Sequence, residues 1–233
     1  MFFDENNYEE ESLMIGSYKI LQSKDLYRFT SDAVMLSRFA EKNAERVADF
    51  CSGSGIIGLH YYALCTKKPE KVVLCELQKC LADMSEKSVE LNGLKNVFTV
   101  ICGDLNDLDY NGEFDLILCN PPYKKRGSGY PVQNEHLAIC KNEIKVTLSE
   151  IVKVASAALK RRGKLCMCNA VDRLEETFRE FSANGLSPSK LAFVSAKEGA
   201  APYLFMIEGV KGVKASLKVL PQAANSARDF SGE

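Results

Sequence analysis

The segment RVADFCSGSGIIGLHYYALC (46–65) decides the fold: in it an apolar run leads through a glycine-rich turn into a helix-length stretch. Residues 46–50 predict a buried strand and residues 56–65 a helix. The turn between them reads Asp49-Phe50-Cys51-Ser52-Gly53-Ser54-Gly55. Glycine lets a ligand approach the backbone closely, and the start of the helix supplies free N–H groups. We therefore expect a ligand to bind at this turn.

The same alternation of apolar runs and helix-length stretches continues along the chain. Further strands are predicted at 71–76, 97–102, 114–120, 163–169, 190–195 and 203–208. Helices are predicted at 78–91, 146–161 and 171–184. This order predicts an α/β fold of the Rossmann-like, doubly wound type, with a mostly parallel seven-stranded sheet and helices on both faces.

Three regions follow from this pattern. Residues 1–42 are expected to form a short N-terminal extension, with a strand pair over 13–23 and a helix that begins at Thr30, Ser31 and Asp32. Residues 43–220 would form the main domain. Residues 221–233 are rich in Ala, Ser, Asn and Gly and are expected to be a disordered tail.

Composition places the chain among globular proteins of the cytoplasm. Hydrophobic residues make up 46% and charged residues 26% of the 233 residues. No run of about eighteen apolar residues predicts a membrane span, and the acidic N-terminus does not read as a secretory signal. The nine cysteines contain no CxxC pair and accompany only two histidines, so we predict no metal site and small buried cysteines in a reducing compartment.

The net charge of −1 argues against a strongly nucleic-acid-binding chain, but it hides a local excess of bases. Residues 124–164 hold ten Lys and Arg against three Glu. That cluster could contact phosphates or could be a solvated basic face. Lys124, Lys125 and Arg126 stand beside two glycines at the predicted site, where they would bind substrate phosphates or form an ordinary solvated loop.

Acidic residues stand at the ends of three successive predicted strands. Asp49 precedes the glycine turn, Glu76 ends the second strand and Asp104 follows the third. Gly53, Gly55 and Gly58 also match the G-x-G-x-x-G pattern, so a dehydrogenase that uses NAD has to be considered. Glu76 could bind ribose hydroxyls of either NAD or S-adenosylmethionine. A carboxylate at Asp49 would repel a pyrophosphate and attract an ammonium group; the plainer interpretations are helix capping for Asp49 and a turn for Asp104.

Asn120-Pro121-Pro122-Tyr123 follows the fourth strand and is the most informative tetrapeptide of the chain. The exocyclic amine of a base is a poor nucleophile, because its lone pair is delocalised into the ring. The Asn120 side-chain carbonyl and the Pro121 backbone carbonyl could each accept one N–H of such an amine. Paired prolines fix φ and hold these carbonyls in place, and Tyr123 could stack on a base taken out of its stack. The alternative is a rigid turn that ends in a surface tyrosine.

With these residues the chain resembles class I S-adenosylmethionine-dependent methyltransferases that carry the Asn-Pro-Pro-Tyr motif. More closely, it resembles the valine-tRNA adenine-N6 methyltransferases, which modify the adenine beside the anticodon. The resemblance runs from about residue 13 to 220. The motifs that carry it are KILQSKDLYRFTSDAVMLSRFA (19–40), DFCSGSG (49–55), CELQKCLADMSEKSVELNGL (75–94), GDL (103–105), NPPY (120–123), NEHLAICKNEI (134–144) and IEGVKG (207–212).

The resemblance implies S-adenosylmethionine as cofactor, S-adenosylhomocysteine as product and tRNA as substrate. The residues implied to bind the donor are Thr30, Asp32, Asp49, Gly53, Gly55, Glu76, Leu77, Asp104, Leu105 and Asn120. Asn120, Pro121, Pro122 and Tyr123 would hold the target amine. Two departures stand out: Cys51 occupies the place of the first glycine of the usual turn, and the segments CNAVDRL and AKEGAAPY carry few bases for a tRNA-binding protein.

Other functions remain open at this point. The same tetrapeptide also suits N-methylation of a glutamine amide in a release factor, because an amide nitrogen is delocalised in the same way. Those enzymes usually have a longer helical N-terminal domain. A dehydrogenase would use the glycines and leave the tetrapeptide without a role. A catalytically inactive RNA-binding module would bind tRNA without binding the methyl donor.

Overall fold

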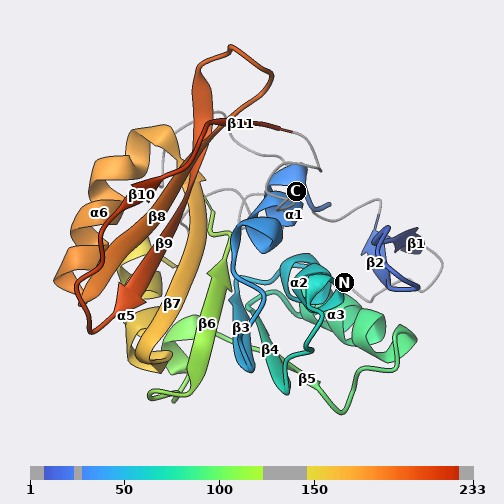
Figure 1. The fold of residues 1–233 in the computed structure, drawn as a ribbon. Coiled ribbons are helices and arrows are strands. Elements are labelled where there is room, and N and C mark those ends of the chain that lie inside the picture. The colour runs from blue at the N-terminus through green and yellow to red at the C-terminus, as the bar shows by residue number, and fades with distance from the viewer. Residues whose placement is uncertain (1–7, 24–27, 123–145, 226–233) are drawn as a thin grey trace.

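The computed structural model describes residues 8–23, 28–122 and 146–225. Its main sheet has nine strands, in the order β10-β8-β9-β7-β6-β3-β4-β5, with β11 paired to β8 (Figure 1). The seven longer strands are β3 (Arg46–Phe50), β4 (Lys71–Glu76), β5 (Phe98–Cys102), β6 (Phe114–Cys119), β7 (Leu159–Ala170), β8 (Leu186–Ser195) and β9 (Pro202–Lys211). β3 to β7 are mutually parallel, and β9 is antiparallel to both of its neighbours. The predicted mostly parallel α/β fold is therefore confirmed.

The strand count differs from the predicted seven because two short strands come from the end of the chain. β10 (Lys218–Val219) and β11 (Ala223–Ala224) both pair with β8 in parallel. The side chain of Ala223 is buried, so the beginning of the predicted disordered tail lies on the sheet. Two-residue strands have no hydrophobic period, and their pairing with a distant edge strand leaves no local pattern in the sequence.

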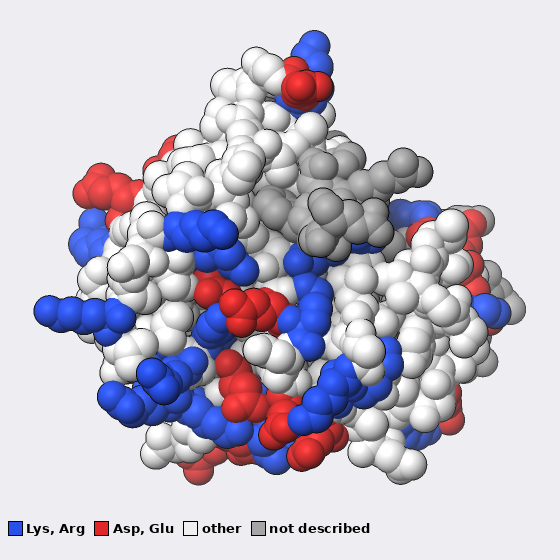
Figure 2. All heavy atoms as spheres, in the orientation of Figure 1, with Lys and Arg blue, Asp and Glu red and all other residues white. Residues whose placement is uncertain are grey.

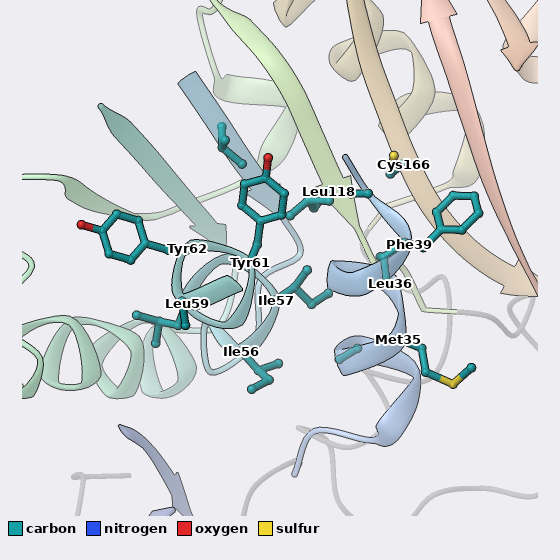
Figure 3. Packing of buried hydrophobic residues seen from close by; sticks show 14 of the residues in the cluster. Met35, Leu36, Phe39, Ile56, Ile57, Leu59, Tyr61, Tyr62, Leu118 and Cys166 are labelled. Carbon is teal, nitrogen blue, oxygen red and sulfur yellow. The ribbon is translucent and has the colours of Figure 1, made fainter. Parts of the chain in front are cut away.

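Helices cover both faces of the sheet, as predicted. On one face lie α1 (Ser31–Phe39), α2 (Ile56–Leu64) and α3 (Lys79–Leu91). On the other lie α5 (Leu148–Ala158) and α6 (Leu174–Ala183) (Figure 1). α2 is buried almost all round because it packs on the sheet and beside α1, where Leu36 and Ile57 belong to one core cluster with Leu118 of β6 (Figure 3). Short 3-10 turns at Leu105–Asp107 and Val171–Arg173 complete the elements.

The N-terminal strand pair is real but lies earlier than expected. β1 (Tyr8–Ser12) and β2 (Lys19–Ser23) form an antiparallel pair, whereas both strands were predicted within 13–23. The acidic segment forms a strand because bases neutralise it: Lys19 pairs with Glu10, and Arg28 pairs with Glu9 and Glu11. β2 packs on α3, where Ile20 is fully buried.

Of the basic residues counted over 124–164, the structure describes Lys153, Lys160, Arg161, Arg162 and Lys164. Residues 160–164 lie at the start of β7, at the amino edge of the parallel strands and away from Asn120. There Lys160 pairs with Asp115 at 2.6 Å and Lys164 with Glu41 at 2.8 Å. Figure 2 shows Lys and Arg intermixed with Asp and Glu over the lower part of this face. Lys160 and Lys164 therefore meet acids in the fold, and the phosphate-binding role of the basic stretch as a whole stays a prediction.

None of the eight described cysteines forms a disulfide with another, and five of them are buried: Cys65, Cys75, Cys119, Cys166 and Cys168. Cys51 and Cys80 are half-buried and Cys102 is exposed, so the prediction of buried cysteines holds for most of them. Over the described ranges no helix has the length and apolar character needed to cross a membrane. In the same ranges no three His, Cys, Asp or Glu side chains gather as a metal would require.

Candidate active site

The glycine turn joins β3 to α2 at the carboxyl edge of the parallel strands. Cys51, Gly53 and Gly55 have positive φ angles of 57°, 57° and 81°. A left-handed conformation costs an L-residue roughly 1–2 kcal/mol, so Cys51 is strained where a glycine would not be. A Cβ added to Gly53 would meet no atom within 4 Å, whereas one on Gly55 would lie 2.9 Å from Leu74 Cδ1. The backbone at Gly53 therefore borders open space that a ligand can enter.

Asp49, at the end of β3, is completely buried. Its Oδ2 accepts a hydrogen bond of 2.9 Å from the backbone N–H of Gly58, in the first turn of α2. Its Oδ1 is buried and has no hydrogen-bond partner among the residues that the structure describes. Burial raises the pKa of Asp49 to about 8, and the nearby Glu76 charge adds to this, while the Gly58 hydrogen bond opposes it. Asp49 thus caps the helix, as the plainer interpretation expected, and still has one oxygen available for another donor.

Glu76 ties the ends of β3 and β4 together. Its Oε2 accepts from the Gly53 N–H and its Oε1 from the Gln78 N–H, each at 2.9 Å. The carboxylate is buried, and burial raises its pKa against the effect of these hydrogen bonds. Each carboxylate oxygen has a second lone pair, so Glu76 can hold the turn and still accept hydrogen bonds from a ligand's hydroxyls.

The end of β5 is hydrogen-bonded to the end of β4. The Gly103 N–H donates to the Glu76 carbonyl at 3.0 Å, which brings Asp104 beside the end of β4. Asp104 Oδ1 accepts from the backbone and side-chain N–H groups of Asn106, so the predicted simple turn is present. Leu105 is buried, and Leu77 is a large apolar side chain that is 36% exposed. Leu77 thus offers an exposed apolar surface beside three strand-end acids.

α1 presents Asp32 from its first turn. Asp32 is buried, and Oδ1 accepts a hydrogen bond of 2.6 Å from the hydroxyl of Tyr203, at the beginning of β9. Oδ2 accepts one of 3.2 Å from Thr30, which is the N-cap residue of α1 but makes no side-chain cap hydrogen bond. Both carboxylate oxygens of Asp32 therefore receive hydroxyl donors.

Asn120 follows β6 at the same carboxyl edge, where Pro121 is buried and Pro122 half-buried. Its Oδ1 accepts a hydrogen bond of 2.9 Å from the thiol of Cys168, a fully buried residue of β7. Tyr123, Lys124, Lys125 and Arg126 lie outside the described residues, so their predicted roles stay predictions.

Sequence reasoning missed two residues that hold site side chains in place, Cys168 and Tyr203. Cys168 had been assigned only a packing role, and Tyr203 lies in the segment AKEGAAPY, noted only for its lack of bases. Their partners are 48 and 171 residues away in the chain. No local pattern indicates such contacts.

These residues fit a methyl donor of the S-adenosylmethionine type. The unpartnered Asp49 Oδ1 suits an ammonium group. The open space at Gly53 lets a ligand lie directly against the backbone. Glu76 suits ribose hydroxyls, and Leu77 suits the face of a purine ring.

Comparison with known proteins identifies the family of this chain. The family model described as "Methyltransferase small domain" matches residues 29–183, more than half of the chain. The tRNA1(Val) (adenine(37)-N6)-methyltransferase of Tolumonas auensis is 25% identical over 197 residues, which is 84% of this chain and 81% of that protein. Its namesake from Bacteroides thetaiotaomicron is 22% identical, over 82% and 79%.

Among solved structures, a predicted O-methyltransferase from Agrobacterium tumefaciens superposes with a TM-score of 0.64 at 19% identity. The alignment covers 82% of this chain and 86% of that one. At this identity the likeness concerns the fold alone. The chain therefore belongs to the methyltransferase small domain family.

Proposed function

We propose that this methyltransferase transfers the methyl group of S-adenosylmethionine to the N6 amine of an adenine in tRNA near the anticodon. The observation that carries the donor assignment is the buried Asp49 carboxyl with its unpartnered Oδ1. A buried carboxylate needs a compensating positive charge or hydrogen bond. The ammonium group of the donor supplies both, whereas the pyrophosphate of NAD would be repelled at the same turn.

We assign the other donor contacts to residues at the ends of the neighbouring strands. Glu76 would hold the ribose hydroxyls, with Gly53 and Gly55 beneath the ligand. Asp104 would accept from the adenine amine, and Leu77 and Leu105 would lie beside the ring. Thr30 and Asp32 would lie over the methionine end.

Asn120 and Pro121 would hold the target amine. Bound S-adenosylmethionine would supply an electrophilic methyl group on a positively charged sulfur. The Asn120 and Pro121 carbonyls each accept one N–H of the amine, which localises the nitrogen lone pair and directs it toward the donor. The site needs no strong general base, because the amine can lose its proton after transfer. Its contribution is positioning and electrostatic stabilisation.

Adenine in tRNA is favoured over other acceptors by the relatives. The relatives from Tolumonas and Bacteroides are both named for this activity, and each aligns over about four fifths of this chain. Methylation of a glutamine amide in a release factor uses the same chemistry at Asn120 and is the second candidate. We propose Tyr123 as the residue that stacks on the target base, and Lys124, Lys125 and Arg126 as contacts to phosphates.

The test is mass spectrometry of digested tRNA that lacks its modifications, after incubation with the protein and S-adenosylmethionine. We expect new N6-methyladenosine with the wild-type protein and none with Asn120→Ala. Asn43→Ala, an exposed asparagine at the other edge of the sheet, serves as the matched control and should retain activity. Methylation of a release-factor glutamine with no tRNA product would replace the tRNA assignment with the second candidate.

A further inference from the structure

The hydroxyl of Tyr203 in β9 contacts Asp32 in α1, although 171 residues separate them in the chain. Asp32 is 8% exposed and, within the described residues, accepts hydrogen bonds from the hydroxyl groups of Tyr203 and Thr30. No Lys or Arg of the described segments forms an ion pair with it. A carboxylate that accepts hydrogen bonds from two hydroxyl groups retains further lone pairs, which can accept hydrogen bonds from a cationic ligand.

The hydroxyl of Tyr203 is itself oriented by a third residue. Asn225 Nδ2 donates to the Tyr203 oxygen at 2.8 Å, so the single hydroxyl proton is directed to Asp32 Oδ1 at 2.6 Å. Burial, together with the hydrogen bond and the charge of Asp32, raises the pKa of Tyr203 above its ordinary value. The phenol therefore stays protonated and remains a permanent donor at physiological pH.

Pairing of the C-terminal segment with β8 places Asn225 beside Tyr203. The Leu220 N–H donates to the Leu191 carbonyl, β11 pairs with the end of β8, and the Asn225 N–H donates to the Ser195 carbonyl at 2.7 Å. The segment thus runs along β8 to the carboxyl edge of the parallel strands. Tyr203, the second residue of β9, lies at this edge, as does Ala170, which ends β7 opposite Leu204. Residues 221–225 therefore complete a hydrogen-bonded chain, Asn225 to Tyr203 to Asp32.

We infer that Tyr203 is a positioning residue that holds the Asp32 carboxylate in place for the ammonium group of the methyl donor, and that the C-terminal segment through Asn225 supports it. This inference rests on the donor assignment of the proposed function. Tyr203 and Asn225, which are far from Asp32 in the sequence, thereby contribute to donor affinity. The inference also predicts which portion of the donor depends on them, because only the methionine portion carries an ammonium group.

The test compares two ligands by isothermal titration calorimetry. S-adenosylhomocysteine carries the amino-acid portion, and 5′-methylthioadenosine lacks it. Tyr203→Phe removes the hydroxyl and keeps the ring. We expect it to weaken binding of S-adenosylhomocysteine about 10-fold, as for loss of a hydrogen bond to a charged group, and to leave 5′-methylthioadenosine unchanged. Asn225→Ala should weaken S-adenosylhomocysteine by a smaller factor, with the same selectivity.

Tyr110→Phe is the matched control, because Tyr110 packs on Phe114 by its ring; it should change neither affinity. Equal weakening of both ligands by Tyr203→Phe would mean that the residue only supports the fold. Unchanged binding of both would overturn the inference directly. Failure of the wild-type protein to bind either ligand would instead overturn the donor assignment on which the inference rests.

Discussion

The free energy of unfolding of the Asp49→Asn variant, relative to that of the wild type, should rise as the pH rises in the ligand-free protein. The pKa of Asp49 lies at about 8 in the folded protein, against 3.8 for an ordinary aspartate. The folded protein therefore binds this proton more tightly than the unfolded chain does. Its stabilising contribution is complete below pH 3.8 and is lost as the pH rises to about 8. The side-chain amide of the Asp49→Asn variant does not titrate in this range, so the substitution removes the dependence.

The magnitude follows from the width of that pH window. Each pH unit within it changes the free energy of unfolding by about 1.4 kcal/mol. From pH 5 to pH 7 the stability of Asp49→Asn relative to the wild type should therefore rise by about 2.7 kcal/mol. The pH-independent costs of the variant, such as an unpaired buried amide N–H, shift both values equally and cancel in this comparison.

The assay is urea unfolding of both proteins at pH 5, 6 and 7, with the exposed Asp107→Asn as the control. The control should show no such trend, because Asp107 lies in solvent. A difference between Asp49→Asn and wild type that stays constant from pH 5 to pH 7 would refute the reasoning.

The same variant should lose affinity for S-adenosylhomocysteine. Wild-type binding at pH 6 should release close to one proton, measured by calorimetry in buffers of different ionisation enthalpy, because the carboxyl must ionise to meet the ammonium group.

Substitutions at three further positions test individual contacts. Gly58→Ala should lower the free energy of unfolding by about 1–3 kcal/mol in urea, because its Cβ would lie 2.5 Å from Leu74 Cδ2 in the core; equal or greater stability would contradict this. Cys168→Ala should lower the turnover of tRNA methylation about 10-fold by releasing Asn120, and Cys168→Ser should restore most of it because a hydroxyl can donate to the same oxygen. Glu76→Gln should weaken S-adenosylhomocysteine binding about 10-fold in calorimetry, because an amide NH2 cannot accept the backbone N–H groups that the carboxylate receives; unchanged affinity would remove Glu76 from the donor site.

Local sequence was sufficient for the framework of the candidate site. Residues 46–50 and 71–76 form strands at the predicted bounds, and the glycine turn leads into α2 as expected. Because parallel strands bring their carboxyl ends to one edge, acids that follow successive strands had to meet there. The proximity of Asp49, Glu76 and Asp104 could therefore be predicted from their positions alone.

Tertiary structure decided the properties that depend on distant partners. The sequence could not indicate that Asp49 is buried with one unpartnered oxygen, that Cys168 donates to Asn120, or that Tyr203 reaches Asp32 across 171 residues. It also could not indicate that Lys160 pairs with Asp115 and Lys164 with Glu41 at the amino edge of the parallel strands. Strands and turns follow from short-range periodicity and backbone preferences, whereas burial, pKa and hydrogen-bond partners follow from which elements pack together, and only the folded chain contains that information.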